Sequence, residues 1–244
     1  MKELYLLVCE GASDIAIIKA VSEKMAQILG KEIEIRELSP TIDATTQKYP
    51  DHGWKKVQSW CEKYGDNIPV PRGVNNVMAL AMLNAKGRLN WRSILKISNA
   101  KGLIIHLDTD IAHHLYVNGL AGQSGQRQHC SDAISSWLGI GNMPVEMYYL
   151  LPSYSTENWL LAKHDHTEPL LSTVPQPINY EAIIDPSALL ISGGYKSYVC
   201  PRRQRRVLSK DYNLYEKYGA DISAVISKVA LRCDELDRFC SYLI

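Results

Sequence analysis

The N-terminal segment lacks the long apolar run of a signal sequence or a membrane anchor. Its apolar run spans only Leu4 to Cys9, and Glu3 and Glu10 flank that run. A secretory signal needs roughly 7–15 consecutive apolar residues, and a membrane helix needs about 20. We therefore interpret this stretch as a buried first strand, and we expect a cytoplasmic protein with no membrane partner.

Excess charge and paired cysteines are missing as well. The formal net charge is +1, with 27 Lys and Arg against 26 Asp and Glu, so no overall field points to nucleic acid or membrane. A partner of either kind would need a local patch. None of the six cysteines forms a CxxC pair, and their spacing fits neither a zinc knuckle nor a disulfide framework. We expect reduced, mostly packed thiols, as is typical of cytosolic proteins.

The order of the first predicted elements indicates an α/β fold with a mostly parallel sheet. Apolar runs predict buried strands over residues 3–9, 102–107 and 144–151, and residues 32–37 alternate as a further strand. A helical pattern lies between the first strand and the one at 32–37, with Ser13 as its predicted cap and Gly30 near its end. A β-α-β order favours parallel strands joined by a right-handed crossover.

The remaining pattern predicts helices on both sides of the later strands. We predict helices over residues 54–64, 75–86, 131–138, 155–162 and 181–190, and one continuous helix over 221–243. Residues 38–52, 113–128 and 164–177 are predicted loops, and residues 201–210 are strongly basic. The sequence shows no internal repeat and no clear linker.

Acidic residues follow three of the predicted strands. In chain order these segments supply Glu10 with Asp14, then Asp108 with Asp110, then Ser155 with Glu157. If the strands are parallel neighbours, these side chains meet where such sheets bind ligands, beyond the carboxyl ends of the strands. Clustered anions repel one another unless a cation lies between them, and Mg²⁺ or Mn²⁺ prefers carboxylate oxygens. One Mg²⁺ needs fewer carboxylates than these, which predicts two ions and hydrolysis of a phosphodiester.

Three motifs carry a resemblance to a known family: CEGASD at residues 9–14, LDTD at 107–110 and STENW at 155–159. Together they resemble a Toprim domain, the fold shared by topoisomerases, bacterial primases and OLD-type nucleases. The resemblance covers roughly residues 1–165, and it leaves residues 166–244 as a C-terminal extension packed on the core, with the basic segment and a helix. It implies that Glu10 is an acid/base or metal ligand, and that Asp108 and Asp110 hold Mg²⁺.

The ExxxD and SxE spacings are most similar to OLD-type nucleases and their small stand-alone relatives in bacterial defence loci. This likeness implies that Asp14 and Glu157 complete a two-ion site, with Ser155 in support. It also implies a later catalytic lysine, for which we predict Lys196, with Lys210 as the competitor. The sequence contains no GxxxxGK[ST] motif, so an ATPase or regulatory partner would be a separate chain.

The only basic cluster in the sequence is predicted to bind the phosphate backbone of DNA or RNA. It consists of Arg202, Arg203, Arg205 and Arg206. Positive charge near an acidic site is needed to offset the repulsion between its carboxylates and the phosphates of nucleic acid. A solvated charged loop is an equal alternative. His106 lies inside an apolar strand, and we interpret it as a hydrogen-bonded core histidine rather than a ligand.

The predicted function is a Mg²⁺-dependent endonuclease of DNA or RNA in bacterial anti-phage defence. Two alternatives stay open. A DxD-type glycosyltransferase explains LDTD, but it explains neither ExxxD nor SxE. A non-catalytic Toprim-like subunit would bind nucleic acid or a partner without cutting. The sequence leaves the oligomeric state open.

Overall fold

The centre of the molecule is a four-stranded parallel sheet with strand order β2-β1-β3-β4. The computed structural model describes residues 2–43, 45–46, 49, 52–66, 89–115, 125–201 and 204–244. The strands are β1 (Lys2–Val8), β2 (Glu32–Ser39), β3 (Gly102–His106) and β4 (Met147–Leu150). Because all four run in the same direction, their carboxyl ends lie at one edge of the sheet.

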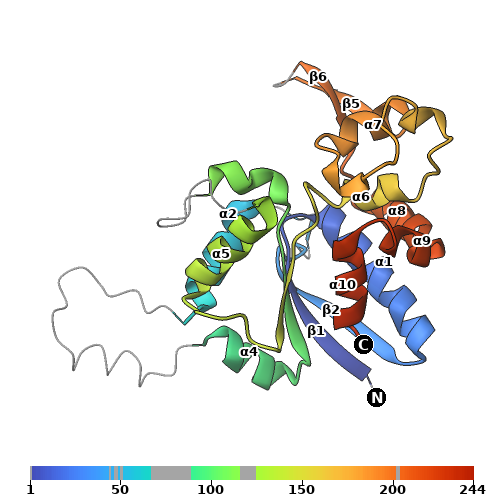
Figure 1. The fold of residues 1–244 in the computed structure, drawn as a ribbon. Coiled ribbons are helices and arrows are strands. Elements are labelled where there is room, and N and C mark those ends of the chain that lie inside the picture. Colours follow the sequence, from blue (N-terminus) through green and yellow to red (C-terminus); the bar gives the residue numbers. More distant parts are fainter. Residues whose placement is uncertain are drawn as a thin grey trace, which may run out of the picture.

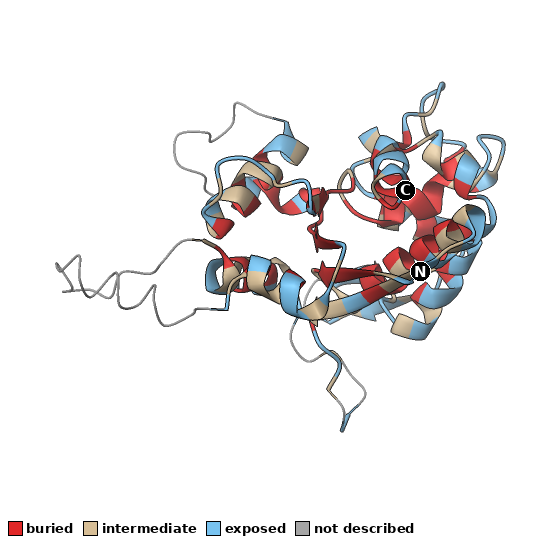
Figure 2. Cartoon of the chain, turned by 90° about the horizontal axis from the view of Figure 1, so that it is seen from below, coloured by how far each residue is buried: buried red, intermediate tan, exposed pale blue. Residues whose placement is uncertain are grey.

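Helices cover both faces of this sheet, which gives an α/β fold (Figure 1). One face carries α1 (Ala12–Leu29), α8 (Tyr212–Ala224) and α10 (Asp234–Tyr242). The other carries α2 (Trp54–Tyr64), α4 (Trp91–Ser98) and α5 (Gln126–Leu138). Buried residues gather along the strands and the inner helix faces, while exposed residues lie on the outer faces (Figure 2).

Side chains that alternate along the central strands pack into two separate apolar cores, one on each face of the sheet. In β1, Tyr5 and Leu7 pack with α1 and α8, while Leu6 and Val8 pack with α2 and α5. This two-sided burial explains why β1 and β3 read as continuous apolar runs. Helices α1 and α8 approach closely at Gly219, where an added Cβ would lie 2.7 Å from the Ala20 Cβ.

The C-terminal part adds short helices and one hairpin. After β4 come α6 (Glu157–Ala162), the 3₁₀ turns η2 (Pro169–Leu171) and η3 (Tyr180–Ala182), and α7 (Pro186–Ser192). An antiparallel hairpin of β5 (Ser197–Cys200) and β6 (Arg205–Leu208) follows and projects from the top of the molecule in Figure 1. Helix α9 (Ile226–Ala230) links α8 to α10. Residues on both sides of position 165 share one apolar cluster, and the proposed division there stays a prediction.

Most predicted strands and the N-terminal helices are confirmed. The predicted strand at 3–9 is β1, the one at 32–37 is β2, and the helix at 54–64 is α2. The predicted strands at 102–107 and 144–151 are β3 and the shorter β4. The predicted helix at 75–86 lies outside the described residues.

Several helix boundaries were predicted wrongly, each for a physical reason. Ser13 is not the cap of α1, because the helix begins after Gly11 and Ser13 lies buried in the first turn. The predicted helix at 181–190 is interrupted because Pro186 cannot continue a helix from its N-terminal side, and α7 begins there with Asp185 as its cap. Helix α5 begins at Gln126, earlier than predicted, where the Arg127 guanidinium donates to the Leu151 carbonyl.

The C-terminal helix prediction was also wrong in its extent. The single helix predicted over 221–243 is the end of α8 followed by α9 and α10, since Val225 and Cys233 have non-helical backbone angles. Residues 205–208 of the basic segment form the second strand of a hairpin. The eight-residue helix α4 was not predicted, although Asn90 caps it by accepting a hydrogen bond from the Ser93 N–H.

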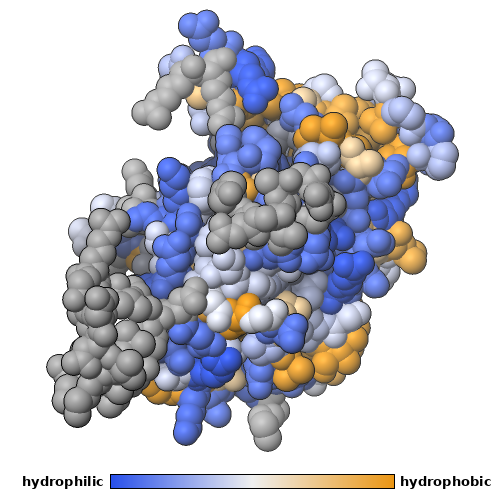
Figure 3. All heavy atoms as spheres, turned by 60° about the vertical axis from the view of Figure 1, so that its left-hand side comes forward, coloured by the Kyte–Doolittle hydropathy of each residue, from blue (hydrophilic) through white to orange (hydrophobic). Residues whose placement is uncertain are grey.

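Two further sequence expectations concern cysteine and membranes. All six cysteines are free, and only Cys200 is not buried, which agrees with the prediction of packed thiols. Among the described residues, no helix is long and apolar enough to span a membrane. The face in Figure 3 is mostly hydrophilic, with apolar side chains in small separate groups among the residues it colours.

Candidate metal site

The predicted acidic residues lie together at the carboxyl edge of the sheet. Glu10 follows β1, Asp108 and Asp110 follow β3, and Glu157 begins α6 after β4, and these three strands are direct neighbours. The Asp108 N–H donates to Glu10 Oε2 over 3.3 Å. The charges of Glu10 and Glu157 raise the pKa of Asp108, and the charge of Asp110 raises the pKa of Glu10. The parallel register of the sheet therefore brings together residues that are almost 150 positions apart.

Asp14 reaches the same place from the first turn of α1. It is 2% exposed, and its Oδ1 accepts a hydrogen bond of 2.6 Å from the Thr156 hydroxyl. An added Cβ at Gly11 in the preceding turn would lie 2.9 Å from Asp14 Oδ2, so a side chain there would displace this carboxylate oxygen. The glycine of CEGASD therefore leaves the Asp14 carboxylate in its observed position.

Asp108 is the most enclosed carboxylate of the DxD pair. It is 6% exposed, and its Oδ1 accepts no hydrogen bond from any residue that the structure describes. Burial, with the charges of Asp14 and Glu10, raises its pKa well above the usual range. Asp110 is exposed, and desolvation likewise raises its pKa, with Lys210 opposing the shift. The pair thus combines a buried carboxylate with one facing solvent.

Glu157 has a different electrostatic environment from its neighbours. It is 1% exposed, and its Oε1 accepts a hydrogen bond of 2.6 Å from the Tyr215 hydroxyl. The Lys210 Nζ lies 3.1 Å from the same oxygen. Burial alone would raise the pKa of Glu157, but the Lys210 charge and the nearby Ser155 and Tyr215 hydroxyls hold it at about 2. Glu157 is therefore an anion near neutral pH, and the role of Ser155 in supporting a metal site stays a prediction.

Lys210 is the lysine that lies among the carboxylates. It follows β6, and the charges of Glu157, Asp14 and Asp108 raise its pKa well above the usual value. Lys196, which we predicted for the catalytic role, is exposed as Lys210 is, but it forms no ion pair with these carboxylates among the described residues. It lies at the base of the hairpin, where its carbonyl accepts from the Ser209 N–H over 2.8 Å. The geometry therefore favours the competitor Lys210.

The predicted arginine cluster lies only partly within the described residues. Arg205 and Arg206 are exposed on β6, and an Arg206 guanidinium N–H donates to the Ser197 hydroxyl over 3.3 Å. Arg202 and Arg203 lie outside the described residues. Strand β6 leads within two residues to Lys210, so the hairpin and the carboxylates are joined by a short piece of chain.

Sequence reasoning missed several polar residues that complete the site. Tyr215 and Thr156 hold Glu157 and Asp14 by hydrogen bonds. Thr156 lies within the STENW motif but was given no role, and no local motif marks Tyr215. Cys9 Sγ lies 3.4 Å from His106 Nδ1, both fully buried. His106 Nε2 has no hydrogen-bond partner among the described residues, so our interpretation of a hydrogen-bonded core histidine holds for one ring nitrogen only.

The donor set fits hard divalent cations. Asp108 Oδ1 and Glu157 Oε2 are buried oxygens that accept no hydrogen bond from the described part of the chain. Buried polar atoms without partners are costly, and a bound cation would satisfy them. Carboxylate oxygens are the ligands that Mg²⁺ and Mn²⁺ prefer. Glu10, Asp14, Asp108, Asp110 and Glu157 could therefore hold such ions.

The raised pKa values predict that the metal-free protein becomes less stable as the pH rises. Burial and the charge of Asp14 raise the pKa of Glu10 to about 7, so the folded state holds this proton more tightly than the unfolded state. Protonated Glu10 therefore contributes its full share to the free energy of unfolding below the ordinary pKa of a glutamate. This contribution is lost as the pH rises through about 7. From about pH 5 to about pH 8, Glu10 should lower the free energy of unfolding by roughly 3 kcal/mol.

Urea unfolding in the presence of a chelator measures this effect. Glu235, whose pKa burial also raises to about 7, adds to the same slope, so the matched control is Glu10→Gln measured against wild type. The free energy of unfolding should decrease less with rising pH in the variant than in wild type. Mg²⁺ should stabilise wild type more at the higher pH. A wild-type stability that stays level or increases over this range would contradict the prediction.

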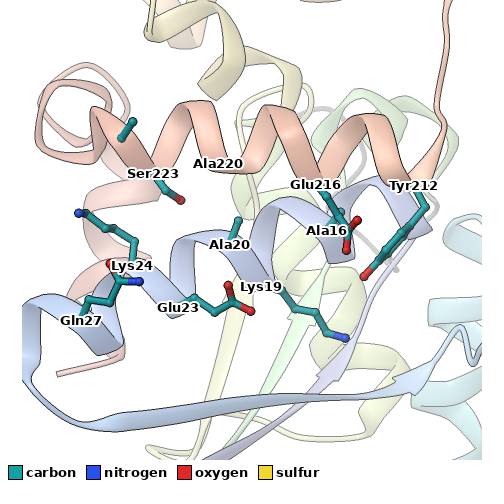
Figure 4. Close-up of a pocket in the computed structure, with 11 residues that line it drawn as sticks. Ala16, Lys19, Ala20, Glu23, Lys24, Gln27, Tyr212, Glu216, Ala220 and Ser223 are labelled. Atoms are coloured by element: carbon teal, nitrogen blue, oxygen red, sulfur yellow. The ribbon is translucent and has the colours of Figure 1, made fainter.

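A separate groove lies between α1 and α8 (Figure 4). Its volume is about 380 Å³, and side chains such as Lys19, Glu23 and Glu216 line it from the two helices. None of the predicted site residues lines this groove. We therefore assign it no part in the chemistry of the carboxylates.

Comparison with known proteins gives no relative for this chain. No protein-family model, curated protein or solved structure matches it. The Toprim likeness therefore rests on the three motifs and on the parallel sheet that presents them.

Proposed function

We propose that this protein is a divalent-metal-dependent nuclease of the Toprim type. The observation that carries the proposal is the convergence of Glu10, Asp14, Asp108, Asp110 and Glu157 beyond three neighbouring parallel strands, with two buried oxygens left without hydrogen bonds from the described residues. Ordinary packing does not account for so many partly desolvated carboxylates, since each costs free energy. Acidic groups with strongly perturbed pKa values are typical of functional sites.

The number and type of ligands favour Mg²⁺ or Mn²⁺, with two ions bound. Mg²⁺ usually takes only one or two protein carboxylates and keeps water or phosphate as its other ligands. When bound, two such ions would supply charge stabilisation for the attacking and leaving oxygens of a phosphodiester. Glu10, Asp14, Asp108, Asp110 and Glu157 are the residues that would hold them.

Two protein groups have properties suited to phosphodiester hydrolysis. Glu10 has a pKa of about 7, raised by burial and by Asp14, so it can accept or donate a proton near neutral pH. Lys210 keeps its positive charge at any physiological pH, because nearby carboxylates raise its pKa. In this proposal Lys210 offsets negative charge that develops on the phosphate.

A nucleic-acid substrate is favoured by the hairpin next to the site. Arg205 and Arg206 are exposed on β6, and Tyr198 on β5 is 54% exposed. Guanidinium groups bind phosphates, and an exposed aromatic ring stacks on bases. A glycosyltransferase that needs only Asp108 and Asp110 for its metal leaves Glu10, Asp14 and Glu157 without a purpose. A role in anti-phage defence, with a separate ATPase or regulatory chain, is part of the proposal by family likeness alone.

The direct test is cleavage by the purified full-length chain. Supercoiled plasmid, linear DNA and structured RNA would each be incubated with Mg²⁺, with Mn²⁺ or with EDTA. We expect cutting of at least one of these substrates with Mg²⁺ or Mn²⁺ and none with EDTA. Binding without cutting under all conditions would favour the non-catalytic subunit, and metal-dependent binding of a nucleotide sugar alone would favour the glycosyltransferase.

The hairpin should contribute binding rather than chemistry. We expect the Arg205→Ala/Arg206→Ala double change to weaken nucleic-acid binding and to reduce the slope of log affinity against log salt by about 1 for each phosphate that the variant no longer binds. The cleavage rate at saturating substrate should change little. The matched control is Lys96→Ala, an exposed cation on α4. Helix α4 lies at the opposite end of the molecule from the hairpin in Figure 1. Equal decreases of affinity in control and variant would contradict a specific role of the hairpin.

A further inference from the structure

Cys9, Asp14 and His106 form a second group of possible metal ligands at the same edge of the sheet. Each offers one ligand atom, and these atoms all lie within 4.8 Å of one another. The three residues are 0%, 2% and 0% exposed. The pairing of Val8 with Ile105 brings the next residues, Cys9 and His106, side by side. The cluster is therefore built by the sheet register and the first turn of α1.

The ligand atoms differ in kind from the carboxylates that suit Mg²⁺. A thiolate, an imidazole and a carboxylate are the three ligand types that Zn²⁺ takes in proteins. In a tetrahedral zinc site with bonds of about 2.0–2.3 Å, ligand atoms lie roughly 3.4–3.7 Å apart. Cys9 Sγ and His106 Nδ1 are 3.4 Å apart. Hard cations such as Mg²⁺ do not select thiolate or imidazole ligands.

The groups around this cluster are those that support a ligating histidine and aspartate. In metal sites the second ring nitrogen of a ligating histidine usually donates to a carboxylate, a carbonyl or water. His106 Nε2 lies 3.5 Å from Asp108 Oδ1, and both atoms are buried without hydrogen-bond partners among the described residues. Asp14 is held in turn by the Thr156 hydroxyl. This orphaned imidazole nitrogen, aimed at a carboxylate, is an independent observation in favour of a ligating role for His106.

We propose that Cys9, Asp14 and His106 form a Zn²⁺ site with three protein ligands and one open position. The Cys9 sulfur would exchange its proton for the metal, and the proton would leave to solvent. The site does not depend on the proposed nuclease activity, because Cys9 and His106 are not among the Mg²⁺ ligands. Since Asp14 belongs to both sets, Zn²⁺ and the ions of the carboxylate site compete for it. Low concentrations of Zn²⁺ should therefore weaken Mg²⁺ binding.

Co²⁺ absorption spectroscopy tests the site directly, because Co²⁺ reports thiolate ligands where Zn²⁺ is silent. Metal-free full-length protein would be titrated with Co²⁺ in the absence of Mg²⁺, because Mg²⁺ competes for Asp14. We expect a thiolate-to-cobalt charge-transfer band that saturates at one equivalent, together with the intense visible bands of four-coordinate Co²⁺. One equivalent of Zn²⁺ should abolish both. A titration without a charge-transfer band would overturn the proposal.

Matched variants assign the band to this cluster. Cys9→Ser should lose the charge-transfer band, whereas Cys61→Ser, at an equally buried cysteine in α2, should keep it. Circular dichroism would establish that both variants are folded. If Cys9→Ser does not fold, His106→Gln replaces it and should bind Co²⁺ at least about tenfold more weakly. A band that survives in the variant with the altered ligand would contradict the assignment.

A further variant separates this proposal from the proposed nuclease function. Asp110→Asn removes a carboxylate outside the zinc ligands, so it should reduce metal-dependent cutting while the charge-transfer band of Co²⁺ stays as in wild type. If wild type never cuts but still shows the band, the nuclease proposal fails and the zinc site stands. If wild type cuts with Mg²⁺ but shows no band, the zinc proposal fails and the nuclease proposal stands.

Discussion

Changing Asp108 to Asn is expected to reduce metal-dependent cutting at least about a thousandfold, which corresponds to roughly 4 kcal/mol of transition-state stabilisation. The amide keeps the size of the side chain but removes its negative charge and one anionic oxygen. Asp108 is 6% exposed, and its Oδ1 accepts no hydrogen bond from the described residues, so this oxygen is a well-enclosed ligand for a cation. A buried hard cation needs such an oxygen.

The same change should affect stability in the opposite direction. Burial and the charges of Asp14 and Glu10 raise the pKa of Asp108 well above its usual range, so ionised Asp108 destabilises the metal-free fold. Metal-free Asp108→Asn should therefore unfold at a higher urea concentration than metal-free wild type at neutral pH. A variant that loses activity while gaining stability cannot have lost activity through misfolding.

Plasmid cleavage rates and Mg²⁺ binding by calorimetry measure the first effect, and urea unfolding with EDTA measures the second. The matched control is Asp132→Asn on α5, whose carboxylate accepts a hydrogen bond from Gln128 one helical turn away and lies outside the predicted site. This control should cut like wild type. Full activity of Asp108→Asn would refute the assignment of the metal ligands.

The second large effect is expected for Lys210→Met, with a loss of about 100-fold in the rate at saturating substrate. Met retains most of the length of the side chain but not its charge. The Lys210 Nζ lies 3.1 Å from Glu157 Oε1 and is attracted by Asp14 and Asp108. If Lys210 stabilises charge that develops on the phosphate, the rate should fall while the substrate affinity changes little.

Two companion variants make this result specific. Lys210→Arg should restore part of the rate, because a guanidinium supplies the charge with different geometry. Lys196→Met removes the lysine that we first predicted for this role, whose exposed side chain lies at the base of the hairpin. We expect near-normal rates from it. A large loss with Lys196→Met and none with Lys210→Met would reverse the assignment of the lysine.

Much of the fold was predictable because the signals are local. Strands β1 and β3 are covered on both faces, so they read as continuous apolar runs, and a strand, turn and helix follow in order within the first 30 residues. Helix breaks in the C-terminal part were harder to predict. The apolar spacing continues across Val225 and Cys233. Only the packing of α8 on α1, of α9 on α6 and of α10 on β4 decides where the chain turns.

The carboxylate site was also predictable only in part. The sequence by itself determined which acidic residues follow which strands, since Glu10 and Asp108 come just after the ends of β1 and β3, and Glu157 begins the first helix after β4. Their meeting required the strand order β2-β1-β3-β4, which no local pattern contains.

The partners of these carboxylates were decided by the tertiary structure alone. Tyr215 bonds to a residue 58 positions away, and Cys9 and His106 are 97 positions apart. Lys210 likewise reaches Glu157 from a distant segment of the chain. Only the packing of separate elements in the folded protein brings such segments within hydrogen-bonding distance. A local sequence pattern determines contacts between near neighbours along the chain and not between separate elements.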